Sequence, residues 1–553
     1  MGLSTIPVMI LLRTVSLSII VCIYTLSGCS GNPDSRNDTF YYNQPEGIRT
    51  LDPAYAKNQP VMWAVHQLYN TLTEVDSQLN IVPALAKEWT LSEDRLIYKF
   101  LLRNDVNFQD HAVFAGGRGR KLVAADVVYS FNRIIDPAVA SSGAWIFNSR
   151  VATNDPFVAV NDSVFELRLI RPCHPILGIL SMQYCSIVPH EAVEKYGKDF
   201  GRHPVGTGPF QLKSWDEGQT MILLKNKNYY EKDESGYTLP YLDAVKVSFL
   251  DNKTAEFLEF QQGRLDFIND IDPNFKDEIL TRNGGLKKEW EGKIQLFKHP
   301  YLNTEYLGFL SDDNSPLLKN SPLRLRQVRQ AMNYAIDKRK MMLYLRNSIG
   351  TPAENGFVPD ALPGFDKGSV QGYIYDKSKA AALLAEAGFP GGKGLPVTKL
   401  ITTPVYAELG AFIVRQFEES GIPVQLETVQ RSTLLEQIAG EQVLFFRGSW
   451  IGDYPDPENY LSVFYGKNPV PPNNTRFSNK QYDQLYEEAI QETNDSLRLQ
   501  LYRKMDQLAM NEAPVIPLWY DMAIHLVSPN ISGFGPNGLN MLELRRVRKG
   551  KAG

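Results

Sequence analysis

A single carboxylate lies between aromatic residues and prolines in the segment "RGSWIGDYPDPENY", residues 447–460 of a 553-residue chain. Asp453 comes three positions after Trp450 and shortly before Pro455 and Pro457. A carboxylate held this rigidly could transfer a proton in catalysis, or it could neutralise a bound cation. It could also serve the backbone alone, by capping a turn ahead of the two prolines. The other motifs of the chain bear on which of these three roles applies.

The sequence lacks the motifs of the common hydrolases and metalloenzymes. It contains no G-x-S-x-G and no H-E-x-x-H, and its seven histidines lack the spacing of metal ligands. The stretch "GGRGRK" (116–121) lacks the G-K-[ST] ending of a phosphate loop and is interpreted as a surface loop. Paired glycosidase carboxylates could still be present among the 62 acidic residues. We therefore expect no enzyme, no cofactor and no metal, and a secreted hydrolase stays as the alternative.

The N-terminal segment "MGLSTIPVMILLRTVSLSIIVCIYTLSGCS" has the pattern of an export signal. One basic residue, Arg13, precedes an apolar run over 14–26 that is shorter than the ~20 residues of a membrane-spanning helix. The tetrad at 26–29, Leu-Ser-Gly-Cys, resembles the bacterial lipobox. That resemblance implies cleavage after residue 28 and a lipid on Cys29, with 29–38 as a polar tether. An ordinary signal with an incidental cysteine is the alternative.

Composition predicts a folded body of more than one domain. Hydrophobic residues make up 43% of the chain and charged residues 22%, which is typical of globular proteins. The net charge of -4 indicates neither a nucleic-acid surface nor a basic membrane patch. About 515 residues follow the tether, enough for two or three domains. Cys173 and Cys185 could form a disulfide in an oxidising compartment, or remain two buried free thiols.

Helix and strand patterns alternate along the second half of the chain, which predicts an α/β domain there. Ser321 is expected to cap a helix that opens at Pro322, and "NYAID" (333–337) indicates a helix end. Further helices are expected after the cap residue Asp376 and before Gly388 and Gly421. The strand candidates are residues 97–102, 245–250 and 424–429.

Four blocks of the sequence carry a resemblance to a known family. They are "LAKEWTLSEDRLIYKFLLRNDVNFQD" (85–110) with "AADVVYSFNRIIDP" (124–137), "PVGTGPFQLKSWDEGQTMILLKNKNYY" (204–230), "LRQVRQAMNYAIDKRKM" (325–341) and "WIGDYPDPENYL" (450–461). In this order they resemble the extracellular solute-binding proteins of family 5, which serve peptide, dipeptide and nickel ABC importers. Within the second block, in "GTGPF", Gly206 and Gly208 are expected where the backbone turns tightly.

The resemblance implies an α/β, two-lobed periplasmic-binding-protein-like fold (type II, cluster C-like) with a hinge and an extra inserted domain. Lobe one is expected to combine residues 39–74, 199–305 and 521–553. The inserted second domain is expected at 75–198, and the opposing α/β lobe at 306–520. The ligand would bind between the lobes, and hinge closure would bury it.

The resemblance also implies roles for the opening segment. In peptide-binding members, an Asp in the W-x-x-D-Y-like segment meets the ammonium of the ligand, and here that residue is Asp453. Burying an ammonium is costly unless a carboxylate pairs with it. The preceding residues, Arg447 to Ile451 with Ser449 and Trp450 between them, would lie along the ligand and pair with its main chain as an added strand.

The opposite end of the ligand has two expected receptors in the family. Some oligopeptide-binding relatives meet the peptide carboxylate six residues before that Asp, at the position of Arg447. Dipeptide-binding relatives use an Arg near 400–410, but this chain has no Arg or Lys within 401–410, which favours longer peptides. Gln59 is expected to offer backbone bonds, and Trp145 either faces the cleft or lies in a core.

The implied function is that of a membrane-anchored substrate-binding component of an ABC importer. It would deliver oligopeptides to a permease with separate ATPase subunits, from the periplasmic face of the cell envelope, as a monomer without nucleic acid. A nickel chelate or an oligosaccharide is the alternative ligand on the same scaffold. A lipoprotein scaffold without transport is a further alternative, of a different class.

Overall fold

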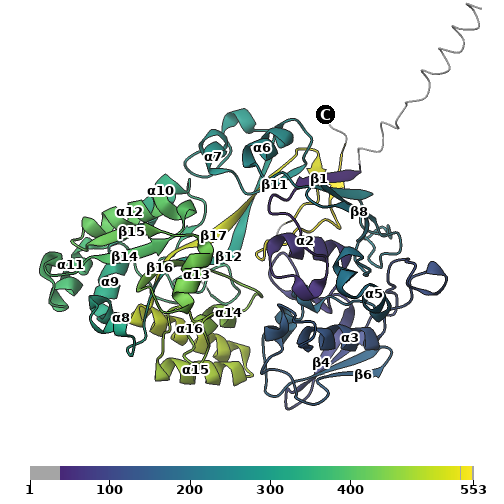
Figure 1. Ribbon diagram of the computed structural model, residues 1–553, viewed down its shortest axis with the longest axis horizontal. Coiled ribbons are helices and arrows are strands. Elements are labelled where there is room, and N and C mark those ends of the chain that lie inside the picture. Colours follow the sequence, from purple (N-terminus) through teal and green to yellow (C-terminus); the bar gives the residue numbers. More distant parts are fainter. Residues whose placement is uncertain (1–37, 366, 536, 551–553) are drawn as a thin grey trace, which may run out of the picture.

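The structure is a computed structural model that describes residues 38–365, 367–535 and 537–550. The expected signal peptide, Cys29 and the tether up to residue 37 lie outside the described residues. Figure 1 shows two lobes side by side, with two long strands running between them. We call residues 38–294 and 528–550 lobe one, at the right and top of Figure 1, and residues 310–514 the opposing lobe, at the left.

One eleven-stranded sheet extends through both lobes. Its order is β15-β14-β16-β12-β17-β11-β1-β10-β9-β8, with β13 paired to β17 off this path. The bounds are β1 (Thr39–Asn43), β8 (Phe210–Asp216), β9 (Thr220–Lys225), β10 (Ala244–Ser248), β11 (Phe267–Asn269), β12 (Gln295–Phe309), β13 (Thr351–Pro352), β14 (Thr398–Thr402), β15 (Val424–Thr428), β16 (Phe445–Ile451) and β17 (Val515–Val527).

The strands β12 and β17 connect the lobes and pair antiparallel along most of their length. Gln295 lies opposite Val527 at one end of this ladder. The register shifts between Pro300 and Thr304, where the strands pass from lobe one into the opposing lobe. A bulge bends and twists the strand that carries it, so this irregularity marks the hinge of the two-lobed fold.

Lobe one carries a second, smaller sheet of four strands. Its order is β4 (Ala86–Leu91), β5 (Ile97–Leu102), β7 (Val164–Arg168) and β6 (Phe157–Asn161). Two short ribbons accompany it, β2 (Thr73–Val75) with β3 (Ile81–Pro83) and β18 (Ile531–Ser532) with β19 (Arg548–Lys549). The helices of lobe one are α2 (Gln59–Leu68), α3 (Ala124–Ile135), α4 (Ile176–Ile179), α5 (His190–Tyr196), α6 (Lys253–Gln261) and α7 (Pro273–Ile279).

Helices surround the sheet of the opposing lobe (Figure 1). Their bounds are α8 (Pro316–Lys319), α9 (Arg326–Tyr334), α10 (Lys338–Leu345), α11 (Lys377–Glu386), α12 (Ala407–Glu418), α13 (Arg431–Ala439), α14 (Pro457–Leu461), α15 (Lys480–Gln491) and α16 (Asp495–Glu512).

Each lobe has a hydrophobic core of its own. The core of lobe one includes Phe100 and Phe131, whereas the opposing lobe has two clusters, one around Phe357 and one around Phe309. Some residues cross this division, because Tyr454 of the opposing lobe packs into the core of lobe one and Leu79 of lobe one packs into the cluster around Phe357. The lobes therefore touch in this structure.

Several sequence predictions of local structure are confirmed. The candidate strand 97–102 is β5, and the strand predicted at 424–429 is β15. Asp376 caps α11 by accepting a hydrogen bond from the backbone N of Lys379 at 2.9 Å, and Gly388 follows that helix with a φ of +89°. Ser321 caps only a single turn, because α9 begins at Arg326. The strand predicted at 245–250 ends earlier, at residue 248.

The glycines of the "GTGPF" block have a different reason from the predicted one. The chain bends at 207–209, as predicted, but neither glycine has a positive φ, so the turn alone does not require glycine. A Cβ at Gly206 would lie 2.1 Å from the carbonyl oxygen of Leu68, and one at Gly208 would lie 2.4 Å from the carbonyl carbon of Leu68. Glycine is therefore required because the segment before β8 approaches the end of α2 too closely for a side chain.

Of the two alternatives for the cysteine pair, a disulfide or two free thiols, the structure has the free thiols. Both Cys173 and Cys185 are free thiols. Cys185 is buried, and its Sγ donates to the carbonyl oxygen of Ile179 at 3.6 Å. Burial raises the pKa of the Cys173 thiol to about 12, so this side chain stays protonated and poorly reactive at neutral pH.

Candidate functional site: an acidic cleft between the lobes

Strand β16 reaches the junction of the lobes with one of its edges open. It pairs antiparallel with β12 from Phe445 to Ile451. The neighbour on its other side, β14, is paired with it only at Phe446. Residues 448–451 therefore have no partner strand on that side within the described parts of the chain. An open edge presents backbone N–H and C=O groups that an extended segment can pair with.

Asp453 directly follows this open edge, and its side chain is exposed. The amide of Asn459 donates to Asp453 Oδ2 at 3.4 Å and its Oδ1 accepts from the Asp453 backbone N at 3.2 Å. Across residues 38–365, 367–535 and 537–550, no Lys, Arg or His forms an ion pair with this carboxylate. Burial raises the pKa of Asp453 to about 6, and the nearby charge of Glu458 adds to the shift. The carboxylate thus reaches solvent and is still partly desolvated, so its charge would gain from a nearby cation.

Lobe one supplies the facing wall of this cleft. Burial raises the pKa of Tyr184, and the negative charge of Asp453 adds to that rise, so the two side chains interact across the cleft. Tyr184 packs against Gly143, where a Cβ would lie 2.5 Å from its ring. Trp145 follows two residues later in a short turn and is 38% exposed. Its carbonyl oxygen accepts a hydrogen bond from Arg150 at 3.1 Å.

Arg447 is engaged in a buried ion pair at the base of the cleft. Its guanidinium pairs with Glu305 of β12, a residue that is only 3% exposed. The same guanidinium lies over the ring of Tyr406, 3.5 Å from the ring centroid. Arg447 Nε is buried without a hydrogen-bond partner among the described residues. The predicted role of Arg447 in binding a peptide carboxylate must therefore compete with Glu305, which already neutralises its charge.

A second charged pair lies beside the first one, on β17. Arg346 Nη2 bonds Asp521 Oδ1 at 2.9 Å, and the Arg346 guanidinium lies 4.6 Å from the ring centroid of Trp519. The amide of Asn303 joins the two pairs, because its Nδ2 donates to Glu305 Oε1 at 3.0 Å and to Asp521 Oδ2 at 3.2 Å. The two ion pairs and Asn303 therefore form one network on the strands that connect the lobes, and the charges within it balance.

Tyr301 marks where the network and the cleft meet. Burial raises the pKa of its phenol, and the charges of Asp521, Glu305 and Asp453 all add to the shift. Three carboxylates therefore lie near one hydroxyl on β12, and two of them have an arginine partner. Asp453 is the carboxylate left to receive a cation from outside the chain.

The remaining predicted residues come from both lobes: Gln59 from lobe one, and Trp450, Ser449 and Ile451 from β16 beside Asp453. Gln59 is the first residue of α2, where backbone N–H groups are not used by the helix, and its Oε1 accepts from Asn269 at 3.2 Å. Trp450 Nε1 donates to Asn459 Oδ1 at 3.1 Å. On β16, Ser449 is half-buried opposite Glu305, and Ile451 is 49% exposed.

Three residues of this site were not predicted from the sequence. Glu305 and Asp521 come from strands far from residue 447 in sequence, and Tyr406 lies in a segment noted only for its lack of Arg and Lys. Their partners are 142, 175 and 41 positions away, and only the assembled sheet brings these residues together. An isolated acid inside a mostly apolar strand, as at Glu305, is the one feature that could have indicated a buried pair.

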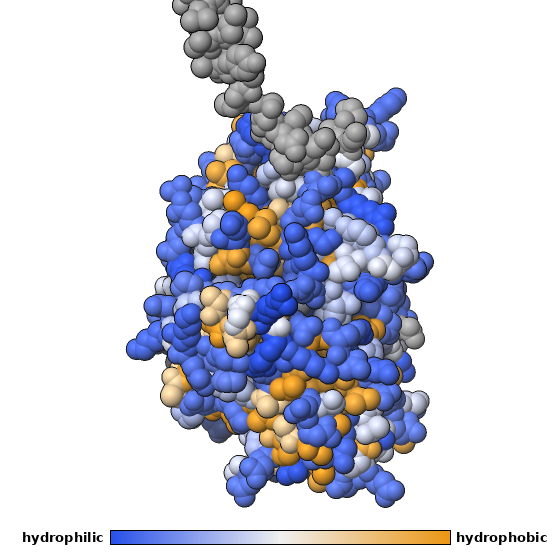
Figure 2. Space-filling model, turned by 90° about the vertical axis from the view of Figure 1, so that its right-hand side faces the viewer, coloured by the Kyte–Doolittle hydropathy of each residue, from blue (hydrophilic) through white to orange (hydrophobic). Residues whose placement is uncertain are grey.

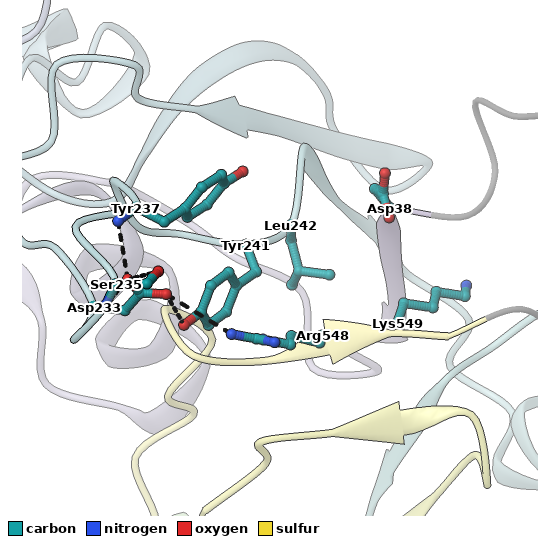
Figure 3. Close-up of a pocket in the computed structure, with 8 residues that line it drawn as sticks. All are labelled: Asp38, Asp233, Ser235, Tyr237, Tyr241, Leu242, Arg548 and Lys549. Atoms are coloured by element: carbon teal, nitrogen blue, oxygen red, sulfur yellow. Dashed lines mark hydrogen bonds and ion pairs between the residues drawn. The ribbon is translucent and has the colours of Figure 1, made fainter.

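A pocket of about 410 Å³ lies elsewhere on lobe one, beside the start of β1. Figure 3 shows Arg548 lying against the ring of Tyr241 and reaching toward Asp233. Lys549, at the other end of this group, pairs with Asp266 at 2.8 Å. The charges of this pocket are compensated within the chain, so we do not assign the ligand to it.

A larger pocket, of about 700 Å³, lies where the two lobes meet, at a contact surface that we call the seam. Trp89, Tyr98 and His174 line it from lobe one, and Pro455 and Asp495 line it from the opposing lobe. Because both lobes supply its walls, this pocket exists only while the lobes are together.

The surface of lobe one is mainly polar. Figure 2 shows the right-hand side of the molecule as largely hydrophilic, with hydrophobic side chains in separate patches. No helix built from the described residues is both long enough and apolar enough to cross a membrane. Nor do the described residues include three His, Cys, Asp or Glu side chains grouped as metal ligands.

Comparisons with known proteins agree with this architecture. Residues 80–471 match the model of the bacterial extracellular solute-binding proteins, family 5. The chain is 29% identical over 520 residues to heme-binding protein A of Haemophilus influenzae, covering 90% of each chain. It is 26% identical over 494 residues to the glutathione-binding protein GsiB of Salmonella choleraesuis, covering 88% of this chain and 89% of the other.

A solved structure with the same fold contains a peptide. It is the ABC transporter-associated periplasmic binding protein DppA from Helicobacter pylori in complex with peptide STSA, with a TM-score of 0.74 and 24% identity. The match covers 93% of this chain and 98% of that one. At this identity the likeness shows the fold alone.

Proposed function

Because this chain belongs to the bacterial extracellular solute-binding proteins of family 5, we propose that it is the substrate-binding component of an ABC importer and that it takes peptides with a free amino terminus. The observation that carries the ligand proposal is the juxtaposition at the end of β16. An open strand edge at 448–451 leads directly to Asp453, a carboxylate without an ion-pair partner among the described residues.

Each part of a peptide has a matching feature in this cleft. The peptide main chain pairs with the open edge of β16, in the manner of an added strand. Its ammonium meets Asp453, whose charge is poorly solvated and gains from a cation. Since the edge binds backbone, side chains contribute little to the affinity. We therefore propose that the protein binds peptides of many different sequences.

The carboxylate end of the ligand is handled differently from the ammonium end. Glu305 already neutralises Arg447, so a ligand carboxylate at that position would face a pair with no net charge. The free Nε of Arg447 is one donor that it could still reach. We infer that the carboxylate contributes less to affinity than the ammonium, which favours peptides longer than two residues.

Glutathione is a member of the same ligand class, and one specific observation favours it. A relative over 88% of this chain is named a glutathione-binding protein, and glutathione carries the free ammonium that Asp453 requires. Heme has no ammonium. Heme binding, as in the name of the other relative, would therefore use a different part of the cleft.

The setting of the protein follows from the same proposal. We propose that Cys29 carries a lipid that holds the protein at the periplasmic face of the cell envelope. There, as a monomer without catalytic activity, it passes its ligand to a permease with separate ATPase subunits. We also propose the expected division into lobe one, the inserted domain at 75–198 and the opposing lobe at 306–520, which the separate four-stranded sheet supports.

Titration calorimetry with the tetrapeptide Ser-Thr-Ser-Ala tests the role of Asp453. Asp453→Ala leaves the ammonium buried without a partner, which costs roughly 3–5 kcal/mol, or two to three decades in Kd. Asp453→Asn is expected to be nearly as harmful, because an amide does not neutralise a cation. The matched control is Asp94→Ala, at an exposed turn of lobe one, which should bind like the unmodified protein.

Two further ligands separate the ammonium from the rest of the peptide. The N-acetylated tetrapeptide lacks the ammonium, so the unmodified protein should bind it weakly and Asp453→Ala should lose little more. Glutathione has a free ammonium, so its affinity should fall in Asp453→Ala as the affinity for the free tetrapeptide does. Equal affinity of the unmodified protein and Asp453→Ala for the free tetrapeptide would overturn the assignment, and tight binding of heme alone would overturn the ligand class.

A further inference from the structure

A histidine of lobe one lies between two carboxylates of the opposing lobe. His174 Nδ1 is 3.4 Å from Asp456 Oδ2, and His174 Nε2 is 3.4 Å from Asp495 Oδ1. His174 precedes α4 in lobe one, whereas Asp456 caps α14 and Asp495 begins α16. Both ring nitrogens therefore face acceptors across the seam. The Nδ1 atom is buried and has no hydrogen-bond partner in good geometry among the described residues.

The surrounding contacts show that this is a true contact surface between the lobes. A Cβ added to Gly178 would lie 3.3 Å from the Cβ of Tyr454, so the backbone of α4 packs tightly on the opposing lobe. The seam pocket of about 700 Å³ is lined by His174, Asp456 and Asp495 together with apolar residues from both lobes. The two carboxylates lie on opposite sides of the imidazole, so they cannot hold one metal ion with it.

Other charged groups face this histidine from every element around it. On the opposing lobe, Arg498 bonds Asp495 at 2.9 Å and holds the pKa of that carboxyl below its ordinary value, with smaller contributions from His174 and Arg95. The further titratable groups nearby are Tyr98, Arg171, Cys173 and Glu458. Asp453 also faces lobe one, at Tyr184 in the cleft.

We propose that His174 is a proton-dependent latch, which holds the lobes closed when its imidazole is protonated and loosens as the imidazole loses its proton. A protonated imidazole donates from both nitrogens and can satisfy Asp456 and Asp495 together. A neutral imidazole carries one N–H, so it serves one carboxylate and turns a lone pair toward the other.

The direction of the effect follows from the difference between the closed and open states. In the closed state the proton on His174 has two carboxylates nearby, whereas in the open state these lie on a separate lobe. The protonated imidazole therefore gains two charge-assisted contacts on closure that the open state lacks, and protonation shifts the equilibrium toward the closed state. Imidazole side chains change charge between about pH 5 and 8, so the latch works in the range that a cell surface encounters.

The size of the effect is limited by solvent. Asp495 is 76% exposed and shares its charge with Arg498, whereas Asp456 is 14% exposed. Partly exposed pairs are worth little each, so two of them correspond to roughly a three- to tenfold change in the closed-to-open ratio.

Hydrogen exchange measured by mass spectrometry on the full chain, without added ligand, tests the latch. The reporters are backbone amides of 176–180 and 493–499, one segment on each side of the seam. After correction for the intrinsic pH dependence of exchange, protection should be three- to tenfold higher at pH 5.5 than at pH 8. His174→Gln should remove this difference, and Asp495→Asn should remove part of it.

The matched control is His190→Gln. His190 pairs with Glu191 at 3.3 Å, but both residues belong to lobe one, so the variant should keep the full pH difference at the seam. Equal protection of the unmodified protein at both pH values would overturn the latch, and so would a His174→Gln variant that keeps the difference. Because no ligand is present, this result is independent of the proposed peptide function.

Discussion

Replacing Arg447 by Met removes the guanidinium from its pair with Glu305 and leaves a buried carboxylate without a cation. Glu305 is 3% exposed, and breaking such a pair costs roughly 3–5 kcal/mol of unfolding free energy. The lost contact between the guanidinium and the Tyr406 ring adds about 1 kcal/mol. Glu305 can take up a proton instead of staying charged. The stated losses of unfolding free energy therefore apply at pH values above the pKa of Glu305 in the folded variant.

The destabilisation should therefore depend on pH, with a definite sign. Burial raises the pKa of Glu305 above 4.5, and Arg447 opposes that rise. Without Arg447 the folded pKa rises further, while the unfolded pKa stays at its ordinary value. A carboxyl with a raised folded pKa loses its contribution to stability as pH rises through that pKa. The deficit of Arg447→Met should therefore be smaller at pH 5 than at pH 8.

Urea unfolding at the two pH values measures this deficit. The double variant Arg447→Met/Glu305→Gln, which removes both charges, should recover most of the stability at pH 8. Arg415→Met is the control, because Arg415 is exposed on α12 and forms only a loose pair with Glu419. An Arg447→Met protein as stable as the unmodified one at pH 8, or a deficit independent of pH, would refute the buried-pair reasoning.

The same double variant separates a structural role of Arg447 from a role in ligand binding. If Arg447 also holds the ligand carboxylate, the double variant should lose more affinity for Ser-Thr-Ser-Ala than for its C-terminal amide. If the arginine serves only Glu305, the two ligands should be affected equally.

Two further predictions concern other parts of the chain. Asp506 is fully buried, accepts from the backbone N atoms of Phe357 and Val358 at 2.8 and 3.2 Å, and has its pKa raised by burial to about 7. The free energy of unfolding that protonated Asp506 contributes is therefore present below pH 4 and is lost as pH rises through 7, by up to about 4 kcal/mol. Asp506→Asn should make the free energy of unfolding less dependent on pH over that range. Parallel pH profiles for the two proteins would contradict this prediction. Cys29→Ala should leave the protein uncleaved or release it from membranes, as fractionation and lipid labelling would show, and continued labelling of the variant would contradict the lipobox.

Local structure could be predicted where neighbouring residues decide it. The strand at 97–102 alternates in burial as its sequence pattern requires, and Asp376 caps the helix that follows it. The same local logic placed a cap at Ser321, but the turn that it caps stops before α9 begins. In its place α9 begins at Arg326 and packs against β17 and α11, which are contacts that no local pattern reveals.

The candidate site was predictable only in part, because its groups come from distant segments. Asp453 could be selected for its setting among prolines and aromatic residues and for the family resemblance. Glu305 could not be selected, since its significance depends on Arg447, 142 positions away. The seam pairs of His174 span even more of the chain. Sequence patterns identify a carboxylate or a histidine, whereas the partner that decides its chemistry is supplied by tertiary packing.

The position of β17 also constrains how the protein is made. This strand, residues 515–527, lies between β12 and β11 in the middle of the sheet that both lobes share. A chain emerging from its N-terminus lacks this central strand until nearly all of it has been synthesised. Neither lobe can complete its sheet early, and native pairing must wait for contacts of very long sequence separation, which makes folding slow. Such a chain stays incompletely folded for most of its synthesis, a state compatible with passage through a narrow export channel.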